Sequence, residues 1–455
     1  MILTLMNTRK IYRLILLIVT LCSLPLMAQE YAIQNVNVIT MDNEEILSGV
    51  TVHVTEGRIV SISKVNGSKN ATIIDGKGKF LMPGLAEMHA HIPPHSAGEE
   101  YVKEVLWLYM ANGITTIRGM LGEPYHLELR KNVSEGSVFG PRIFTSGPSL
   151  NGGTVRTPEE AIQKVISQKK AGYDFLKMHP GIRLDVYDEI VKVAKEQGIP
   201  FAGHVSVFVG VRHALETGYA SIDHLDGYVE GLVPSEENVD PESNGFFGLN
   251  FTELADRSQM DELVALTREH DVWVVPTQSL LERWVGRRSP DELARDHEMR
   301  YVSNRMLGGW VTSKRQFMAA DYKPQRAEDF NQLRRDLIKA LHSGGVKLLL
   351  GSDAPQVFNV PGFSIHNELE ELVRSGLSPF EALETGTRNT AKFFSREEEF
   401  GMIKEGMIAD LVLLEANPLV DIRATRNIAG VMIKGHWLSK TEIKDGLRKI
   451  ELKYK

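Results

Sequence analysis

The spacing of hydrophobic and polar residues divides the chain into three parts. From Tyr31 to about Leu81, apolar and polar residues alternate in short stretches separated by Glu-Gly, Asn-Gly and Asp-Gly pairs. This pattern is typical of β-strands joined by tight turns. A similar pattern returns near the C-terminus, in GMIKEGMIADLVLLEA and NIAGVMIKGHWLSK. We therefore predict one small β-sandwich built from both ends of the chain, residues 29–82 and 401–455.

The middle part, residues 83–400, alternates short apolar runs with amphipathic stretches such as LDVYDEIVKVAKEQG. Thr157-Pro158 followed by two glutamates is typical of a helix start. Eight strand-then-helix units in series predict an α/β fold of the (β/α)8, or TIM-barrel, type. The predicted strands are residues 84–92, 115–120, 142–148, 175–180, 200–206, 221–226, 272–279 and 347–355.

Two longer segments interrupt this series. Residues 229–258 and 280–326 are predicted to be long loops over one mouth of the barrel. A helical hairpin on the surface is equally compatible with the second segment.

The first 28 residues are predicted to be a secretory signal peptide. Arg9, Lys10 and Arg13 precede the apolar run LILLIVTLCSLPLMA, which ends at Ala28. The run is short for a membrane span, so we expect cleavage, a periplasmic or secreted protein and no stable membrane insertion afterwards. An uncleaved anchor is the alternative. Cys22 is the only cysteine, so the mature chain would contain neither a thiol nucleophile nor a cysteine-ligated zinc ion.

Composition adds limits on size and partners. The chain has 455 residues, of which 42% are hydrophobic and 24% charged, with a formal net charge of −7. These values are typical of a globular protein and fit a barrel with a small second unit. The absence of a basic stripe argues against a nucleic-acid partner. A homo-oligomer is compatible with the sequence.

Ionisable residues recur at the predicted strand ends, where barrel enzymes place their catalytic groups. These residues are His89, His91, Lys177, His204, His224 and Asp353. Residues at i and i+2 of a strand point to the same face, so His89 and His91 can bind one ion together. Neutral imidazoles with a carboxylate suit zinc, although another divalent metal is compatible. A single strand histidine is more often a hydrogen-bonded core residue. Four histidines, a lysine and an aspartate, all at strand ends, favour a metal site.

Several motifs resemble those of a known family. PGLAEMHAH, AGHVS, IDHLD and GSDAP resemble the ordered metal motifs of the amidohydrolase superfamily. The stretches HNELEELVRSGLSPFEALETGTRNTAKFF and FGMIKEGMIADLVLLEANPL resemble its imidazolonepropionase-like and prolidase-like branch, which includes Xaa-Pro and Xaa-Arg dipeptidases. The resemblance covers about residues 31–440 and implies a barrel flanked by a β-sandwich. Glu87 departs from the family's usual aspartate, and we expect it to be structural.

The resemblance also implies a ligand set. Lys177, in YDFLKMHPG, would be carboxylated by CO2 and would bridge two zinc ions. His89, His91 and Asp353 would bind one ion, and His204 and His224 the other. The alternative is a neutral or solvent-reaching lysine beside a one-metal site.

These expectations lead to a functional hypothesis. We expect an exported zinc-dependent hydrolase of C–N amide bonds, with Asp353 as general base and a small-molecule or peptide-like amide as substrate. A dipeptidase is one form of it. Cyclic-amide hydrolysis, deamination and lactone hydrolysis stay open as alternatives, as does a metal-binding scaffold without catalysis. Lys177 argues against a deaminase, and the complete ligand set argues against a scaffold.

Three further residues are candidates for substrate contact. Tyr228, four residues after His224, matches a substrate-contacting tyrosine of dipeptidase-like relatives, although a packed tyrosine is equally compatible. Arg118, at the end of the second barrel strand, could contact an anionic substrate group or pair with a neighbouring carboxylate. His179, two residues after Lys177, could lie near the site, although a role in supporting the ligands is favoured over substrate contact.

Overall fold

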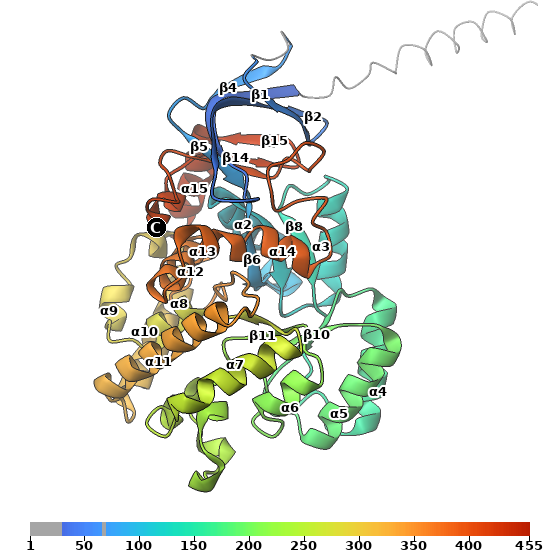
Figure 1. Ribbon diagram of the computed structural model, residues 1–455, viewed down its shortest axis with the longest axis vertical. Helices are drawn as coiled ribbons and strands as arrows, with labels where there is room; N and C mark the ends of the chain where they lie inside the picture. The colour runs from blue at the N-terminus through green and yellow to red at the C-terminus, as the bar shows by residue number, and fades with distance from the viewer. Residues whose placement is uncertain (1–29, 66–69) are drawn as a thin grey trace, which may run out of the picture.

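The computed structural model describes residues 30–65 and 70–455, so the predicted signal peptide lies outside the described residues. Figure 1 shows an α/β body with a layer of strands at one end, where β1, β5, β14 and β15 lie together. Within the described ranges, no helix combines the length and apolar character needed to cross a membrane.

Strands from both ends of the chain form one eight-stranded sheet. Its order is β15-β14-β13-β5-β1-β2-β3, with β4 paired to β1. Leu81 lies between Val38 and Leu413 in neighbouring strands, and all three side chains are buried in one hydrophobic cluster. The strands are β1 (Glu30–Ile39), β2 (Ile46–Thr55), β3 (Arg58–Ser63), β4 (Thr72–Asp75), β5 (Phe80–Pro83), β13 (Leu411–Leu414), β14 (Ile428–Ile433) and β15 (His436–Ser439).

The central part of the chain forms the predicted series of parallel strands. They fall into two hydrogen-bonded groups, β6-β7-β8 and β9-β10-β11-β12. A parallel bridge between Ser146 and Phe175 joins the groups. The strands are β6 (Leu85–Ala90), β7 (Ile114–Gly119), β8 (Arg142–Thr145), β9 (Leu176–Met178), β10 (Phe201–Gly203), β11 (Ser221–Asp223) and β12 (Trp273–Val275).

The eighth predicted strand, residues 347–355, is present only as isolated bridges. Leu348 bridges Val274, and Ala354 bridges Ala90, so this segment lies between β12 and β6. Asp353 has a φ of 61°, which is incompatible with extended backbone and accounts for the interrupted ladder.

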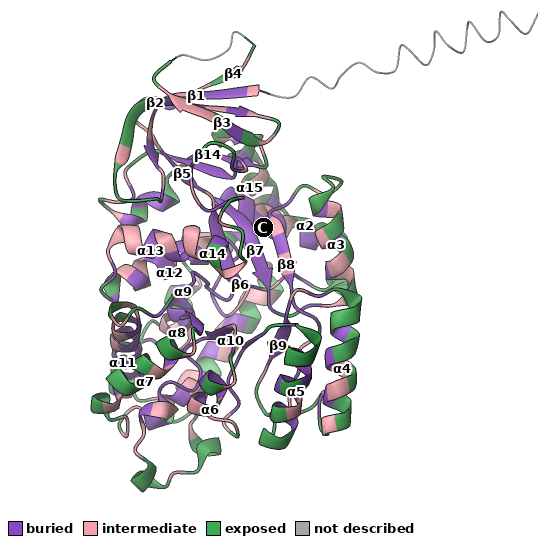
Figure 2. Ribbon diagram, turned by 45° about the vertical axis from the view of Figure 1, so that its right-hand side comes forward, coloured by how far each residue is buried: buried purple, intermediate pink, exposed green. Residues whose placement is uncertain are grey.

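Helices alternate with these strands and cover them. The predicted helix start at Thr157 is confirmed, since its side chain accepts a hydrogen bond from the Glu160 N–H. Figure 2 shows buried strands β6 and β7 inside and exposed stretches along α4 and α5. The helices of this layer are α2 (Glu99–Ala111), α3 (Pro124–Ser134), α4 (Pro158–Ala171), α5 (Leu184–Gln197), α6 (Val211–Glu216), α7 (Met260–Glu269), α11 (Pro324–Ser343), α12 (Phe363–Arg374), α13 (Pro379–Thr385) and α14 (Arg388–Phe393).

The segments predicted as loops contain short helices. Residues 229–258 include the 3-10 turns η2 (Glu230–Leu232), η3 (Ser235–Glu237), η4 (Pro241–Ser243) and η5 (Phe246–Phe251), and η6 (Arg257–Gln259) begins there. Residues 280–326 are mainly helical, so the loop prediction was wrong there, and the alternative of helices is closer to the structure, which has several helices in place of one hairpin. They contain most of α8 (Gln278–Trp284), with α9 (Pro290–Leu293), η7 (His297–Tyr301) and α10 (Asn304–Ala319). Ser289 and Ser303 provide side-chain caps for α9 and α10.

The C-terminal end also contains a helix that the β-sandwich prediction omitted. Helix α15 (Lys440–Tyr454) begins with a capping box between Ser439 and Glu442. It packs against α2, and its buried residues are Ile443 and Ile450. The polar sequence of α15 has only a narrow apolar face, which accounts for the omission.

Candidate metal centre

The structure brings the six predicted ligand residues together at the carboxyl ends of the barrel strands. His89 lies near the end of β6 and Lys177 lies in β9. His91, His204 and His224 come directly after β6, β10 and β11. Asp353 comes from the eighth segment. Parallel strands around a barrel end at one mouth, so residues far apart in sequence meet there.

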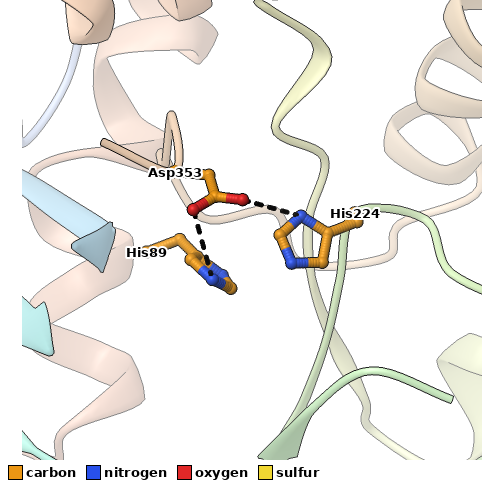
Figure 3. Close-up of side chains that lie close together, drawn as sticks. All are labelled: His89, His224 and Asp353. Atoms are coloured by element: carbon orange, nitrogen blue, oxygen red, sulfur yellow. Dashed lines mark ion pairs between the residues drawn. The ribbon is translucent and has the colours of Figure 1, made fainter. Parts of the chain in front are cut away.

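His89, His224 and Asp353 form the centre of the cluster (Figure 3). Each offers a ligand atom, and these atoms all lie within 4.8 Å of one another. His89 Nε2 is 3.8 Å from Asp353 Oδ1, and His224 Nδ1 is 3.8 Å from Asp353 Oδ2. Two imidazoles and a carboxylate form a donor set that divalent metals accept.

The other three candidates border this cluster. His91 Nε2 is 2.6 Å from Asp353 Oδ1, and Lys177 Nζ is 3.4 Å from His89 Nε2. The His204 ring centroid is 4.5 Å from that of His224. His91 is the most exposed of the three, whereas Lys177 and His204 are buried.

Hydrogen bonds from outside the cluster fix the imidazole rings. His89 Nδ1 is 2.7 Å from Asp223 Oδ2, and His204 Nδ1 is 2.9 Å from Asp226 Oδ2. His224 Nδ1 is 2.9 Å from Thr277 Oγ1. Such partners orient metal-binding histidines and set which ring nitrogen is free.

The free nitrogen of His224 provides a test of whether a metal fits. His224 Nε2 is buried and has no hydrogen-bond partner among the described residues. A buried polar atom without a partner is unfavourable, and a bound cation would satisfy it. The residues present therefore fit a metal ion.

Burial favours the neutral forms of four of these residues, His89, His204, His224 and Lys177. Desolvation lowers the pKa of His204 to about 3, and it also lowers the pKa values of His89 and His224. Desolvation lowers the pKa of Lys177 to about 8. Neutral imidazoles are the forms that bind metal, and a lysine with a lowered pKa loses its repulsive charge more easily.

Several residues in the site adopt a left-handed backbone conformation. The φ angles are 66° at His224, 52° at Leu225, 47° at Thr277 and 61° at Asp353. Residues other than glycine rarely adopt this conformation, and it clusters at functional sites that the surrounding structure holds in place.

Arg118 does not line the site and so does not fit the predicted substrate contact. Its side chain is fully buried, and its Nη2 donates hydrogen bonds of 3.1 Å to both carboxylate oxygens of Asp223. Nε donates to the Met88 carbonyl and Nη1 to Ser221 Oγ. The structure therefore shows the alternative role, pairing with a carboxylate, and Arg118 fixes the partner of His89.

The other two predicted contact residues differ from each other. Tyr228 is fully buried, and its hydroxyl lies 3.0 Å from Thr267 Oγ1 in α7, so the packed alternative is the observed one. His179 is half-buried, with its ring centroid 4.6 Å from that of His204. His179 therefore borders the cluster, as expected.

Four residues that support the ligands were not predicted from the sequence. Asp223 and Asp226 flank His224 in IDHLD, and their carboxylates next to a histidine were a usable signal. No comparable sequence signal indicated Thr277 or Arg334. Arg334 lies in α11 and donates a hydrogen bond of 2.7 Å to the His224 carbonyl.

Glu87 has the structural role expected of it. It is fully buried, and one of its carboxylate oxygens accepts hydrogen bonds from the N–H groups of His89 and Ser352. These bonds join β6 to the eighth segment, which contains Asp353. Burial raises the pKa of Glu87 to about 8.

Comparison with known proteins agrees with this geometry. The family model described as "Amidohydrolase family" matches residues 80–438. The chain belongs to the amidohydrolase family. It is therefore a hydrolase of this family. Like solved members of the family, it combines a TIM-barrel fold with a β-domain.

Individual relatives are distant. Ochratoxinase of Aspergillus niger is 24% identical over 380 residues, covering 75% of this chain and 72% of the relative. Adenine deaminase of Desulforamulus reducens is 23% identical over 409 residues, covering 86% of this chain but only 55% of the deaminase. A solved Xaa-Pro dipeptidase with methionine in its active site has a TM-score of 0.65 at 20% identity, covering 90% of this chain and 100% of that one.

Proposed function

We propose that this amidohydrolase hydrolyses C–N amide bonds with two divalent cations, zinc in the first instance, held by the six clustered residues. The observation that carries the proposal is that His224 clusters with His89 and Asp353 while its buried Nε2 has no partner among the described residues. When bound, the ions would supply Lewis-acid polarisation of the substrate carbonyl and lower the pKa of water near them.

Lys177 is proposed to bridge the two cations as a carbamate. Only 1% of its surface is exposed, and burial lowers its pKa to about 8, which raises the fraction of neutral amine near physiological pH. A neutral amine is the form that adds to CO2, forming an N–C bond and releasing one proton. The modification converts a cation into an anion, which is the charge that a position among metal ligands favours.

Asp353 is proposed to move the proton in the reaction. Its carboxylate lies between His91 and the His89–His224 pair, within hydrogen-bond distance of His91 Nε2. In this position Asp353 can accept a proton from the attacking water and return it to the leaving nitrogen.

The proposed substrate is a small-molecule or peptide-like amide, with a dipeptide as one form. A cavity of about 720 Å³ with Val205, Ser206 and Glu230 in its lining could hold a small ligand, but none of the six clustered residues lines it, so it lies beside the metal centre. Val205 and Ser206 directly follow His204 in the chain. The similarity of the chain to a solved Xaa-Pro dipeptidase and to ochratoxinase is compatible with a hydrolase of this class. We also propose that the protein is periplasmic or secreted, because the sequence of residues 1–28 is typical of a signal peptide.

Deamination is the second candidate, because adenine deaminases are among the relatives. The buried lysine in the ligand cluster favours the amide hydrolase over the deaminase. Lactone hydrolysis uses the same activated water and differs only in the bond attacked.

A substrate panel tests the proposal. Zinc-loaded protein is assayed against dipeptides, N-acyl amino acids, lactones and adenine, with Asp353→Asn beside the wild type. We expect turnover of amides and a loss of at least about 10²-fold in kcat for Asp353→Asn, as for removal of a general base. Circular dichroism checks that the variant is folded. Turnover of lactones or adenine alone, or near-normal activity of Asp353→Asn, contradicts the proposal.

A further inference from the structure

Phe247 lies next to two imidazoles of the metal centre, although it belongs to none of the ligand motifs. Its ring centroid is 5.8 Å from that of His204, with an interplanar angle of 26°, and 5.3 Å from that of His224. Phe247 comes from η5, in the segment between β11 and α7. An aromatic side chain therefore forms one wall of the site.

The backbone around Phe247 holds this ring in place. Phe247 has φ 52° and ψ 40°, the left-handed region that bulky residues rarely adopt. Gly245 and Gly248 on either side also have positive φ, at 70° and 83°. A Cβ at Gly248 would lie 2.8 Å from Val229 Cβ and 2.9 Å from Glu230 Oε2, so no larger residue fits there. Such an unfavourable conformation persists where the surrounding packing imposes it, and it points to a functional role.

Phe247 begins a row of aromatic rings that leads away from the metal centre. Phe246 meets Phe247 edge to face, with centroids 4.7 Å apart, and stacks on Trp284 at 5.1 Å. Phe317 lies 6.2 Å from Phe246. All four side chains are half-buried, so they retain surface that a ligand can contact.

We propose that Phe247 determines specificity by selecting substrates that carry a flat apolar ring beside the bond to be cleaved. The inference rests on the proposed function, which places the substrate carbonyl at the metal centre. A group attached to that carbonyl would then be within reach of Phe247, where two aromatic rings attract each other beyond simple burial. The attraction corresponds to a preference of about 2- to 10-fold for an aromatic over a small aliphatic group.

Two metal-binding hydroxamates test this proposal without turnover. Benzohydroxamate carries a ring next to its chelating group, and acetohydroxamate carries a methyl group at the same position. Calorimetry gives the dissociation constants of both for zinc-loaded wild type, Phe247→Leu and Phe247→Trp. Phe247→Leu keeps an apolar side chain but removes the ring, and Phe247→Trp restores an aromatic face. Phe139→Leu is the control, because Phe139 is 40% exposed and packs against His436 in the terminal sheet.

We expect the preference for benzohydroxamate to fall about 2- to 10-fold in Phe247→Leu and to persist in Phe247→Trp and Phe139→Leu. An unchanged preference in Phe247→Leu, an equal loss for both hydroxamates, or no binding of either by zinc-loaded wild type overturns the inference. Amide turnover is measured separately. A protein that shows the expected preference but hydrolyses no amide contradicts the proposed function, and the role of Phe247 in recognising a ring stands.

Discussion

At the scale of single residues, the candidate site depends on pairs in which one side chain orients another. Asp223 orients His89, and Arg118 fixes Asp223 in turn. All three are buried, so the arrangement is protected from solvent screening. The sequence identified the histidines because they stand at strand ends, but the charge partners depend on which strands become neighbours. The sequence consequently left two roles open for Arg118, substrate contact and pairing with a carboxylate, and the structure shows the second, with Asp223 on another strand.

Replacing Asp223 by Asn tests this orienting role. The amide removes the negative charge beside His89 Nδ1, so we expect zinc affinity to fall about 10- to 100-fold, measured by competition with a chromogenic chelator. Asp188→Asn is a matched control, since Asp188 pairs with His213 at 2.7 Å but both side chains are exposed. The account is contradicted if Asp223→Asn binds zinc as tightly as Asp188→Asn.

At the scale of elements, polar groups buried between neighbouring elements connect the barrel to its surroundings. His366 in α12 is 2% exposed, and its Nδ1 lies 3.0 Å from Thr425 Oγ1 in η8 (Ile422–Arg426). His366 Nε2 has no partner among the described residues. Burial lowers the pKa of His366 to about 3. His366 therefore remains neutral in the folded protein under conditions that protonate it in the unfolded chain.

This pKa difference predicts a specific acid sensitivity. The unfolded chain binds a proton at His366 below its ordinary pKa of about 6.5, and the folded protein does not, so stability falls as the pH decreases from 6.5 towards 3. His366→Gln removes this contribution. When the pH falls from 7.5 to 5, the wild type should lose about 2 kcal/mol more of its free energy of unfolding than His366→Gln does, measured by urea unfolding. His436→Gln, at an exposed position, is the control. A pH-independent difference for His366→Gln refutes the prediction.

Some helices and strands could be predicted from the sequence and others could not, depending on whether local spacing or distant packing determines them. Amphipathic helices such as α4 and α5 follow from local spacing and caps, and the order of the barrel strands follows from their alternation with helices. Within residues 278–319, α8 and α9 are short and α10 is longer, and Trp284 and Trp310 pack in one hydrophobic cluster there, which local spacing does not reveal. The position of Phe247 could not be predicted, because local spacing gives no sign of its left-handed backbone or of the close packing of Val229 and Glu230 around the neighbouring Gly248.

At the scale of the whole molecule, the two ends of the chain form one sheet. Leu413 in β13 pairs with Leu81 in β5 and Gly430 in β14, and it is 2% exposed. The repeated β-pattern at both ends predicted this association. The pairing of β13 with β5 brings residues before and after the barrel together, so we expect this sheet to contribute to the stability of the barrel.

Leu413→Asp tests that contribution. A charge buried without a partner in this sheet should reduce the free energy of unfolding by more than about 3 kcal/mol, measured by urea unfolding followed by tryptophan fluorescence. Val420→Asp is the control, because Val420 is 80% exposed in the same terminal region. Similar small effects of the two substitutions would show that the terminal sheet does not stabilise the whole molecule.

The central claim is that six residues from five strand ends bind two cations that make water reactive. The most direct measurement is the rate of amide hydrolysis as zinc is added stepwise to metal-free protein. We predict no turnover without metal and a rate that rises to a plateau at two equivalents of zinc for each chain. A rate that is the same before and after complete removal of metal contradicts the account.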